Sequence, residues 1–238
     1  MTAKRRATAK RRGGAPFRVF VTGTDTGVGK TQVSVALLSL LAEAGARPAP
    51  FKPYESGCED LSAPSDALAM RQAARSRDPL ARICVHRFAQ PLAPGVAASR
   101  LGTEPSFART LEAFRAFAGR SLVAEGAGGL YVPIDARREV MDLIVRLRLP
   151  VVLVARAGLG TLNHTALSLD ALENRGVPVR AVVLSQGAPT GDPSREDNAR
   201  WIARRHRVRV LGPVPYEPDP VRRQLLFQEA LRPLVEGE

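Results

Sequence analysis

Residues 23–31 read GTDTGVGKT, and this glycine-rich stretch decides the fold expected for the chain. The preceding run, 17–22 (FRVFVT), is short and rich in β-branched and aromatic residues, which predicts a buried strand. Apolar residues then recur at helical spacing from 30 to 44, and Gly45 follows as a C-terminal cap. The sequence therefore predicts a strand, a glycine-rich loop and a helix in direct succession.

This succession is typical of a phosphate-binding loop. Backbone N–H groups of such a loop surround phosphate oxygens, and the helix N-terminus adds positive potential. We expect Lys30 to reach the outer phosphates and Thr31 to supply a hydroxyl for magnesium. Thr24 departs from the plain pattern, because glycine is expected there and Gly23 lies one residue earlier. A chance glycine-rich turn is the alternative, which the position of Gly-Lys-Thr between strand and helix disfavours.

Short apolar runs alternate with helix-length segments along the rest of the chain. The further runs are 47–51, 121–124, 151–155, 179–184 and 208–211. This alternation predicts a mostly parallel sheet flanked by helices, as in α/β proteins. A helical stripe that includes Leu162, Leu169 and Leu172 is expected to face the core. The stretches 57–64 and 90–95 are expected to be irregular loops.

Composition and charge indicate one large domain with a basic extension. The chain has 238 residues, of which 45% are hydrophobic, enough to bury a substantial core. We expect a single domain at 17–238, preceded by a disordered basic tail at 1–16. The formal net charge is +12, to which the tail contributes. A solvated extension is favoured over binding of nucleic acid or of an acidic partner.

The cysteine, histidine and hydropathy patterns indicate in which cellular compartment the protein is expected. Cys58 and Cys84 lack CxxC spacing and the histidines are scattered, so we expect a reducing compartment and no zinc site. No apolar stretch has the length of a membrane helix, and the N-terminus lacks the apolar core of a signal peptide. The expectation is a cytoplasmic protein without a membrane partner.

Polar residues follow several predicted strands, at the edge where parallel sheets bind ligands. The stretch 52–57 (KPYESG) places Lys52 and Ser56 there, although an ordinary surface lysine is the alternative. Asp66 lies in the first turn of a predicted helix, where it indicates by itself only a capping arrangement. Glu125 ends another strand before several glycines, and a carboxylate in that position can serve Mg²⁺.

A second helix N-terminus follows the strand predicted at 151–155. Residues 158–164 (GLGTLNH) open this helix, and their free backbone N–H groups can hold an anionic group of a substrate. Capping of the helix by Thr161 or Asn163 is the alternative.

Taken in order, VTGTDTGVGKT, KPYESG, SDAL, EGAGG and GTLNH resemble the motifs of dethiobiotin synthetases, over a span from about Phe17 to Tyr216. The resemblance implies a doubly wound P-loop NTPase fold, a homodimer, and an ATP-dependent cyclo-ligase of biotin biosynthesis. In the implied reaction, 7,8-diaminopelargonic acid and CO₂ or bicarbonate give a carbamate, which takes the γ-phosphoryl group as a carbamic–phosphoric anhydride. The second amine then displaces phosphate and closes the ring of dethiobiotin, leaving ADP.

The resemblance also implies roles for individual residues. Lys30 and Lys52 neutralise the charges of the carbamate and the γ-phosphate, and Thr26 lies near the carbamate. The implied Mg²⁺ ligands are Thr31, Asp66 and Glu125. The implied ATP contacts are Gly27, Val28, Gly29, Lys30, Thr31, Gln32, Asp66, Glu125, Gly126, Ala127, Gly128, Ser185, Gln186, Pro215, Tyr216 and Glu217. The implied contacts to the diamine are Ser56 and, given by the partner subunit, the backbone of Gly160, Thr161, Leu162 and Asn163.

Two positions depart from the family pattern. Ser185-Gln186 stands where members commonly have Asn-Asp, whose Asn reads the adenine base, so the preference for ATP over other nucleotides is open. Gln186 is the candidate replacement. Gly95 stands where many members have histidine, and we expect a loop change there without loss of activity.

Three other classes of protein account for fewer of these features. Switch ATPases of the partitioning or division-site type share the expected fold, but carry a signature lysine where this chain has Asp25. Amidating ligases of cobalamin synthesis add a glutaminase domain, for which this chain is too short. A nucleic-acid-binding role rests on charge alone, since no RRM, KH or helix-turn-helix signature is present, and no nucleic-acid partner is expected.

Overall fold

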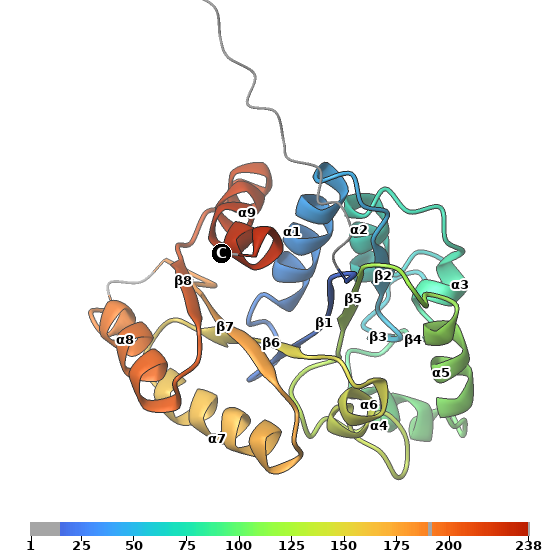
Figure 1. Cartoon of the computed structure of the whole chain (residues 1–238). Coiled ribbons are helices and arrows are strands. Elements are labelled where there is room, and N and C mark those ends of the chain that lie inside the picture. Colours follow the sequence, from blue (N-terminus) through green and yellow to red (C-terminus); the bar gives the residue numbers. More distant parts are fainter. Residues whose placement is uncertain (1–14, 190–191, 238) are drawn as a thin grey trace, which may run out of the picture.

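The computed structural model describes residues 15–189 and 192–237, arranged around a six-stranded sheet (Figure 1). All neighbouring strands pair in parallel, in the order β2-β5-β1-β6-β7-β8. The strands are β1 (Arg18–Gly23), β2 (Ala49–Phe51), β5 (Leu122–Glu125), β6 (Val151–Arg156), β7 (Val179–Ser185) and β8 (Val210–Val214). The parallel sheet expected from the alternating apolar runs is confirmed.

Helices cover both faces of the sheet, so the fold is doubly wound. The helices are α1 (Lys30–Glu43), α2 (Ser65–Ala73), α3 (Leu80–Ile83), α4 (Pro94–Arg100), α5 (Phe107–Arg115), α6 (Val140–Leu147), α7 (Thr161–Asn174), α8 (Arg195–His206) and α9 (Pro220–Glu236). Figure 1 shows α1, α2 and α9 on one face, and α6, α7 and α8 on the other. Along β1, Val19 and Val21 belong to the core beneath α1 and α9, whereas Phe20 belongs to the opposite core. Every second residue of this central strand therefore faces a different helix layer.

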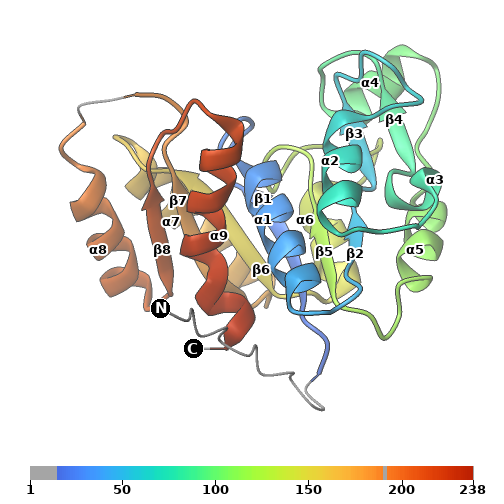
Figure 2. The same cartoon turned by 90° about the horizontal axis from the view of Figure 1, so that it is seen from above.

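A small second sheet adjoins the β2 edge and was not expected from the sequence. Its strands, β3 (Tyr54–Ser56) and β4 (His86–Phe88), pair in parallel, and α4 lies with them in a lobe at one end of the molecule (Figure 2). Such short strands carry too few residues for a recognisable alternation. The expected loop 90–95 is also corrected at its end, because α4 begins at Pro94, a residue well suited to the first helical turn.

The stripe expected on α7 is only partly buried. Leu169 and Leu172 belong to the core, but 42% of Leu162 is exposed. The stripe interpretation was wrong at Leu162, because the buried face of α7 begins with Thr161 and Thr165, and Leu162 is turned away from it.

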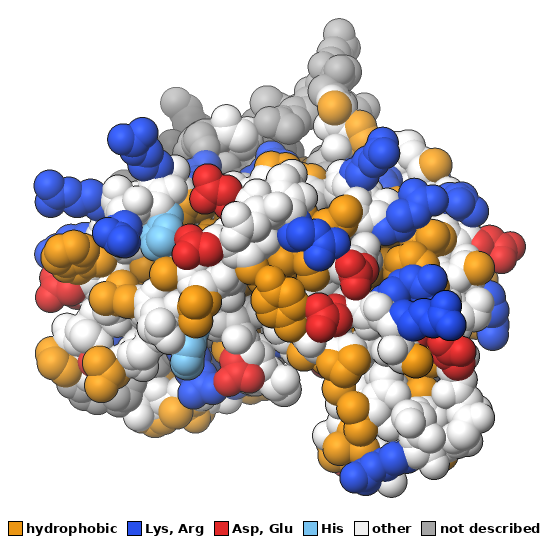
Figure 3. Space-filling view, turned by 90° about the horizontal axis from the view of Figure 1, so that it is seen from below, with side chains coloured by type: hydrophobic (Ala, Val, Ile, Leu, Met, Phe, Trp, Pro, Cys, Tyr) orange, Lys and Arg blue, Asp and Glu red, His pale blue; other side chains and the backbone are white. Residues whose placement is uncertain are grey.

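The described residues include no helix long and apolar enough to cross a bilayer. On the face seen in Figure 3, basic side chains form several separate groups with acidic side chains between them. The basic tail expected at 1–16 lies outside the described residues up to position 14.

The core beneath α1 predicts a measurable stability difference. Leu37 is fully buried, whereas 58% of Leu225 on α9 is exposed. We expect Leu37→Ala to lower the free energy of unfolding by about 2–5 kcal/mol, because it leaves a cavity in a close-packed layer. We expect Leu225→Ala to change it by less than about 0.5 kcal/mol. Urea unfolding of both variants measures the difference, and equal effects would contradict the placement of α1.

Candidate functional site

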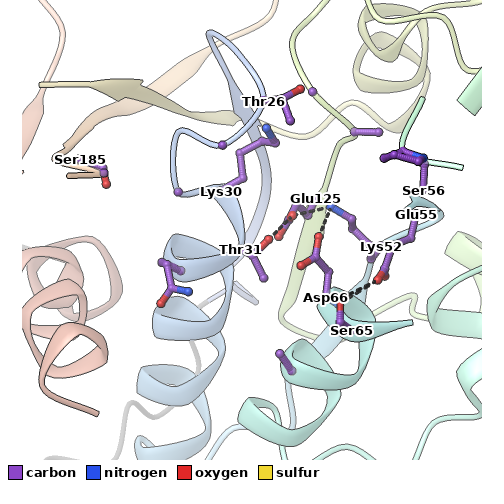
Figure 4. Close-up of a pocket in the computed structure, with 18 of the residues that line it drawn as sticks. Thr26, Lys30, Thr31, Lys52, Glu55, Ser56, Ser65, Asp66, Glu125 and Ser185 are labelled. Atoms are coloured by element: carbon purple, nitrogen blue, oxygen red, sulfur yellow. Dashed lines mark hydrogen bonds and ion pairs between the residues drawn. The ribbon is translucent and has the colours of Figure 1, made fainter. Parts of the chain in front are cut away.

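A cleft of about 820 Å³ opens at the carboxyl ends of the parallel strands. The glycine-rich loop between β1 and α1 forms one wall, and the segment after β2 with the start of α2 forms the other (Figure 4). Ser185, at the end of β7, and Pro215 and Tyr216, after β8, line its far end. Ligand sites of open α/β sheets lie at this edge.

The glycine-rich loop holds backbone conformations that favour glycine. Gly27 and Gly29 have φ of 73° and 99°, and Gly29 is the N-cap of α1. A Cβ at Gly29 would lie 3.0 Å from Ser185 Oγ, so the position is restricted in space as well. Within the described chain, no side chain caps this helix, which leaves its first N–H groups for an anion.

Lys30 lies on the floor of the loop and is 7% exposed. Its Nζ donates a hydrogen bond of 2.8 Å to the backbone oxygen of Asp25. Burial, and next the positive charge of Lys52, lower the pKa of Lys30 to about 8. An anionic ligand would oppose both effects and favour the charged lysine.

Lys52 and Glu125 meet because their strands are neighbours. β2 pairs with β5 so that Phe51 lies beside Ala124. The residue that follows each of these two along the chain, Lys52 or Glu125, carries a charged side chain. Lys52 Nζ lies 2.6 Å from Glu125 Oε1 and 3.1 Å from Asp66 Oδ2 (Figure 4). Burial acts to lower the pKa of Lys52, but the two carboxylates outweigh it and raise this pKa above its usual value. Lys52 is therefore a permanent positive charge at the cleft.

The oxygen atoms beside Lys52 fit a hard divalent cation such as Mg²⁺. Thr31 Oγ1 donates a hydrogen bond of 3.0 Å to Glu125 Oε1. The second oxygen, Glu125 Oε2, is buried and has no hydrogen-bond partner in the described parts of the chain. The Asp66 side chain is 36% exposed toward the cleft. A hydroxyl, a buried carboxylate with an unpaired oxygen and a partly exposed carboxylate thus line the same cleft.

Glu55 is a buried carboxylate of the cleft that the sequence did not single out. Its side chain accepts hydrogen bonds from the backbone N–H groups of Asp66 and Ala67, at 2.9 and 3.0 Å. Burial raises the pKa of Glu55, an effect that these two hydrogen bonds oppose. Its position in the KPYESG stretch was visible, but its partners lie on another element, so the sequence alone carried no signal of this contact.

Comparisons with known proteins show the family of this chain. A family model described as an AAA domain matches residues 18–224. The ATP-dependent dethiobiotin synthetase BioD of Anaeromyxobacter dehalogenans (strain 2CP-C) is 50% identical over 207 residues, which cover 86% of this chain and 92% of the relative. The chain belongs to the dethiobiotin synthetase family. The synthetase of Anaeromyxobacter sp. (strain Fw109-5) is 43% identical over 215 residues, covering 90% of this chain and 96% of the relative.

Two further similarities extend the picture of this dethiobiotin synthetase family member. The biotin biosynthesis bifunctional protein BioCD of Bordetella avium (strain 197N) is 47% identical over 203 residues, 84% of this chain but only 40% of that protein. Among solved structures, the MinC:MinD cell division protein complex of Aquifex aeolicus matches with a TM-score of 0.53 at 12% identity, covering 93% of this chain and 96% of that chain. At this identity the match shows the shared P-loop NTPase fold alone.

Most of the residues expected from the family resemblance line the cleft. They are Thr26, Gly27, Gly29, Lys30, Thr31, Gln32, Lys52, Ser56, Asp66, Glu125, Ala127, Gly128, Ser185, Gln186, Pro215 and Tyr216. Within the described chain, Val28, Gly126, Glu217 and the stretch Gly160–Asn163 do not line it. Residues that line the cleft without having been expected are Tyr54, Glu55, Ser65, Ala69, Pro91, Leu92, Ala93, Pro94, Val132, Gly187, Arg223 and Phe227.

Gln186 does not present a free amide to the cleft. Its Nε2 donates a hydrogen bond of 3.0 Å to the backbone oxygen of Ala188, and its Oε1 accepts one from Arg195. Ser185 lies beneath the loop, close to Gly29. Both polar atoms of the Gln186 side chain are therefore engaged by their own segment, which disfavours Gln186 as a reader of the nucleotide base.

The lowered pKa of Lys30 predicts that nucleotide affinity depends on pH. Since the pKa of Lys30 is lowered to about 8, the free enzyme is charged here below that pH and loses the charge as pH rises through it. We expect the dissociation constant of Mg-ATP to increase above this pH, by up to about tenfold per pH unit. Lys30→Arg should flatten the dependence, because guanidinium does not titrate in this range. Calorimetric titration at several pH values measures it, and unchanged wild-type affinity would refute the assignment.

Proposed function

We propose that this chain closes the ureido ring of dethiobiotin from 7,8-diaminopelargonic acid, CO₂ and ATP, with ADP and phosphate as the other products. The observation that carries the proposal is the convergence of Lys30, Lys52 and Glu125 at the mouth of a phosphate-binding loop. Relatives that cover most of the chain are named as ATP-dependent dethiobiotin synthetases, which supports the same reaction. A cytoplasmic enzyme of biotin biosynthesis follows from the proposal.

The chemistry joins two anions, and the cleft supplies opposite charge. One amine adds to CO₂ and loses a proton, which gives a carbamate. A carbamate oxygen then attacks the γ-phosphorus as the bond to ADP breaks, and the second amine attacks the carbamoyl carbon as phosphate leaves. Lys30 and Lys52 stabilise the charge that builds up between carbamate and phosphate. Thr26 lines the cleft on the same loop wall as Lys30.

Thr31, Asp66 and Glu125 are proposed to hold Mg²⁺. The bound ion supplies charge neutralisation and orientation for the terminal phosphates. The chain's own contribution is the placement of these oxygens: Asp66 and Glu125 also pair with Lys52, so the carboxylates and the ammonium group lie side by side in the cleft.

The diamine is proposed to lie between two subunits of a homodimer. Ser56 lines the cleft beside Lys52 and can hydrogen-bond the amine or carbamate end. The first turn of α7 lies away from its own cleft, and Leu159 beside it is 90% exposed. An exposed apolar side chain next to the start of α7, which has no side-chain cap within the described chain, fits a contact with the partner's substrate carboxylate.

Lys52→Ala tests the proposed reaction. We expect dethiobiotin formation to fall by about 10²–10³-fold, because a preorganised positive charge is lost at the reacting phosphate. Lys52→Arg should recover part of the loss, since it keeps the charge but changes its shape. Mass detection of dethiobiotin with Mg-ATP, bicarbonate and the diamine measures both, and thermal unfolding checks the fold. ATP hydrolysis indifferent to the diamine would instead favour a switch ATPase of the MinD fold.

The proposed subunit contact predicts complementation between two impaired variants. Asn163→Asp places a negative charge where the substrate carboxylate would bind. A heterodimer of Lys52→Ala with Asn163→Asp, purified through two different tags, then contains one intact site. We expect about half of the wild-type activity at low diamine concentration. If both residues served the same subunit's site, the heterodimer would have no intact site and would remain as impaired as either parent.

A further inference from the structure

Glu55 occupies a position in the cleft that the proposed reaction does not use. It lies on β3, three positions after Lys52 in the sequence, and its side chain is turned toward the start of α2 (Figure 4). Only 4% of the residue is exposed. A carboxylate so deeply buried is costly unless its oxygens are hydrogen-bonded. Both oxygens are: Oε1 accepts from the N–H of Asp66, and Oε2 from the N–H of Ala67.

These two contacts replace the cap that α2 lacks. Pro64 is the N-cap residue of α2, and its side chain carries no hydrogen-bond acceptor that could cap the helix. The second and third helical N–H groups, which an N-cap side chain usually satisfies, belong to Asp66 and Ala67. Glu55 provides their acceptors from a strand of the other sheet, and its negative charge also suits the positive end of the helix.

The same first turn carries one of the proposed magnesium ligands. Asp66 contributes its N–H to Glu55 and its carboxylate to Lys52, 3.1 Å away. Its side chain is partly exposed, so few other contacts restrain it. The backbone position set by Glu55 therefore decides where the Asp66 carboxylate stands relative to Lys52 and Glu125.

We propose that Glu55 is a positioning residue for the divalent cation: it caps α2 from β3 and thereby fixes Asp66 at the cation site. The inference rests on the proposed role of Asp66 as a metal ligand. Groups that orient metal ligands without touching the metal commonly change affinity by about 10- to 100-fold when they are removed. Glu55 thus links the segment that carries Lys52 and Ser56 to the helix that carries Asp66.

The test is Mn²⁺ binding to the protein–ADP complex, followed by electron paramagnetic resonance of free Mn²⁺. We expect Glu55→Gln to raise the dissociation constant of Mn²⁺ by about tenfold, since each carboxylate oxygen accepts one N–H group and the amide nitrogen that replaces one of them cannot accept. Glu59→Gln is the matched control, because Glu59 is exposed on the loop that follows β3, and it should leave the constant unchanged. ADP affinity without metal should be equal in all three proteins.

Two further variants separate positioning from general loss of structure. Asp66→Asn should weaken Mn²⁺ binding at least as much as Glu55→Gln, and the double variant should bind no more weakly than Asp66→Asn alone. Pro64→Ser in the Glu55→Gln background gives α2 an N-cap hydroxyl for the same N–H groups, and should restore part of the affinity. Additive losses, or an Mn²⁺ affinity unaffected by Glu55→Gln, would overturn the proposal.

This experiment is independent of the overall reaction, because it needs neither the diamine nor turnover. A protein that makes no dethiobiotin but shows the expected Mn²⁺ series would contradict the proposed function and leave the role of Glu55 standing. Normal synthesis with additive Mn²⁺ losses would do the reverse.

Discussion

The buried ion pair between Lys52 and Glu125 is the interaction on which the rest of the site depends. The two residues are 4% and 0% exposed, and an isolated charge at either position would cost several kcal/mol. Strand pairing places them side by side, since each directly follows a paired residue of β2 or β5. Thr31 of α1 then donates a hydrogen bond to Glu125, and Asp66 of α2 forms an ion pair with Lys52. One contact therefore joins two strands and two helices at the edge where the phosphate-binding loop opens.

This arrangement gives the cleft two lysines of different character. Lys52 is held positive by its carboxylates, whereas burial lowers the pKa of Lys30 toward neutrality. A phosphate bound in the loop would therefore stabilise the charged form of Lys30, and would compete with Glu125 and Asp66 for the ammonium group of Lys52. The cleft thus has one permanently charged lysine and a second whose charge an anionic ligand stabilises, which suits a reaction that must bring a carbamate and a triphosphate together.

The sequence predicts the features that depend on local pattern. The loop at 23–31, the helix after it and the buried strands all follow from spacing and apolar runs, and five motifs in order indicate the family. The sequence does not predict contacts between elements that lie far apart along the chain. The short strands β3 and β4 carry too little periodicity, Glu55 finds its partners on α2, and the Gln186 side chain is bound by Ala188 and Arg195. Leu162 is exposed because two threonines, Thr161 and Thr165, take the buried face of the first turns of α7, and an apolar pattern does not single out threonines.

The central claim is that the cleft brings a carbamate oxygen onto the γ-phosphorus between Lys30 and Lys52. The most direct test supplies CO₂ labelled with heavy oxygen and measures the label in inorganic phosphate by mass spectrometry, at times short compared with exchange into water. If the carbamate is the phosphoryl acceptor, one labelled oxygen appears in each phosphate released, and only when the diamine is present. Unlabelled phosphate formed together with dethiobiotin would contradict the account.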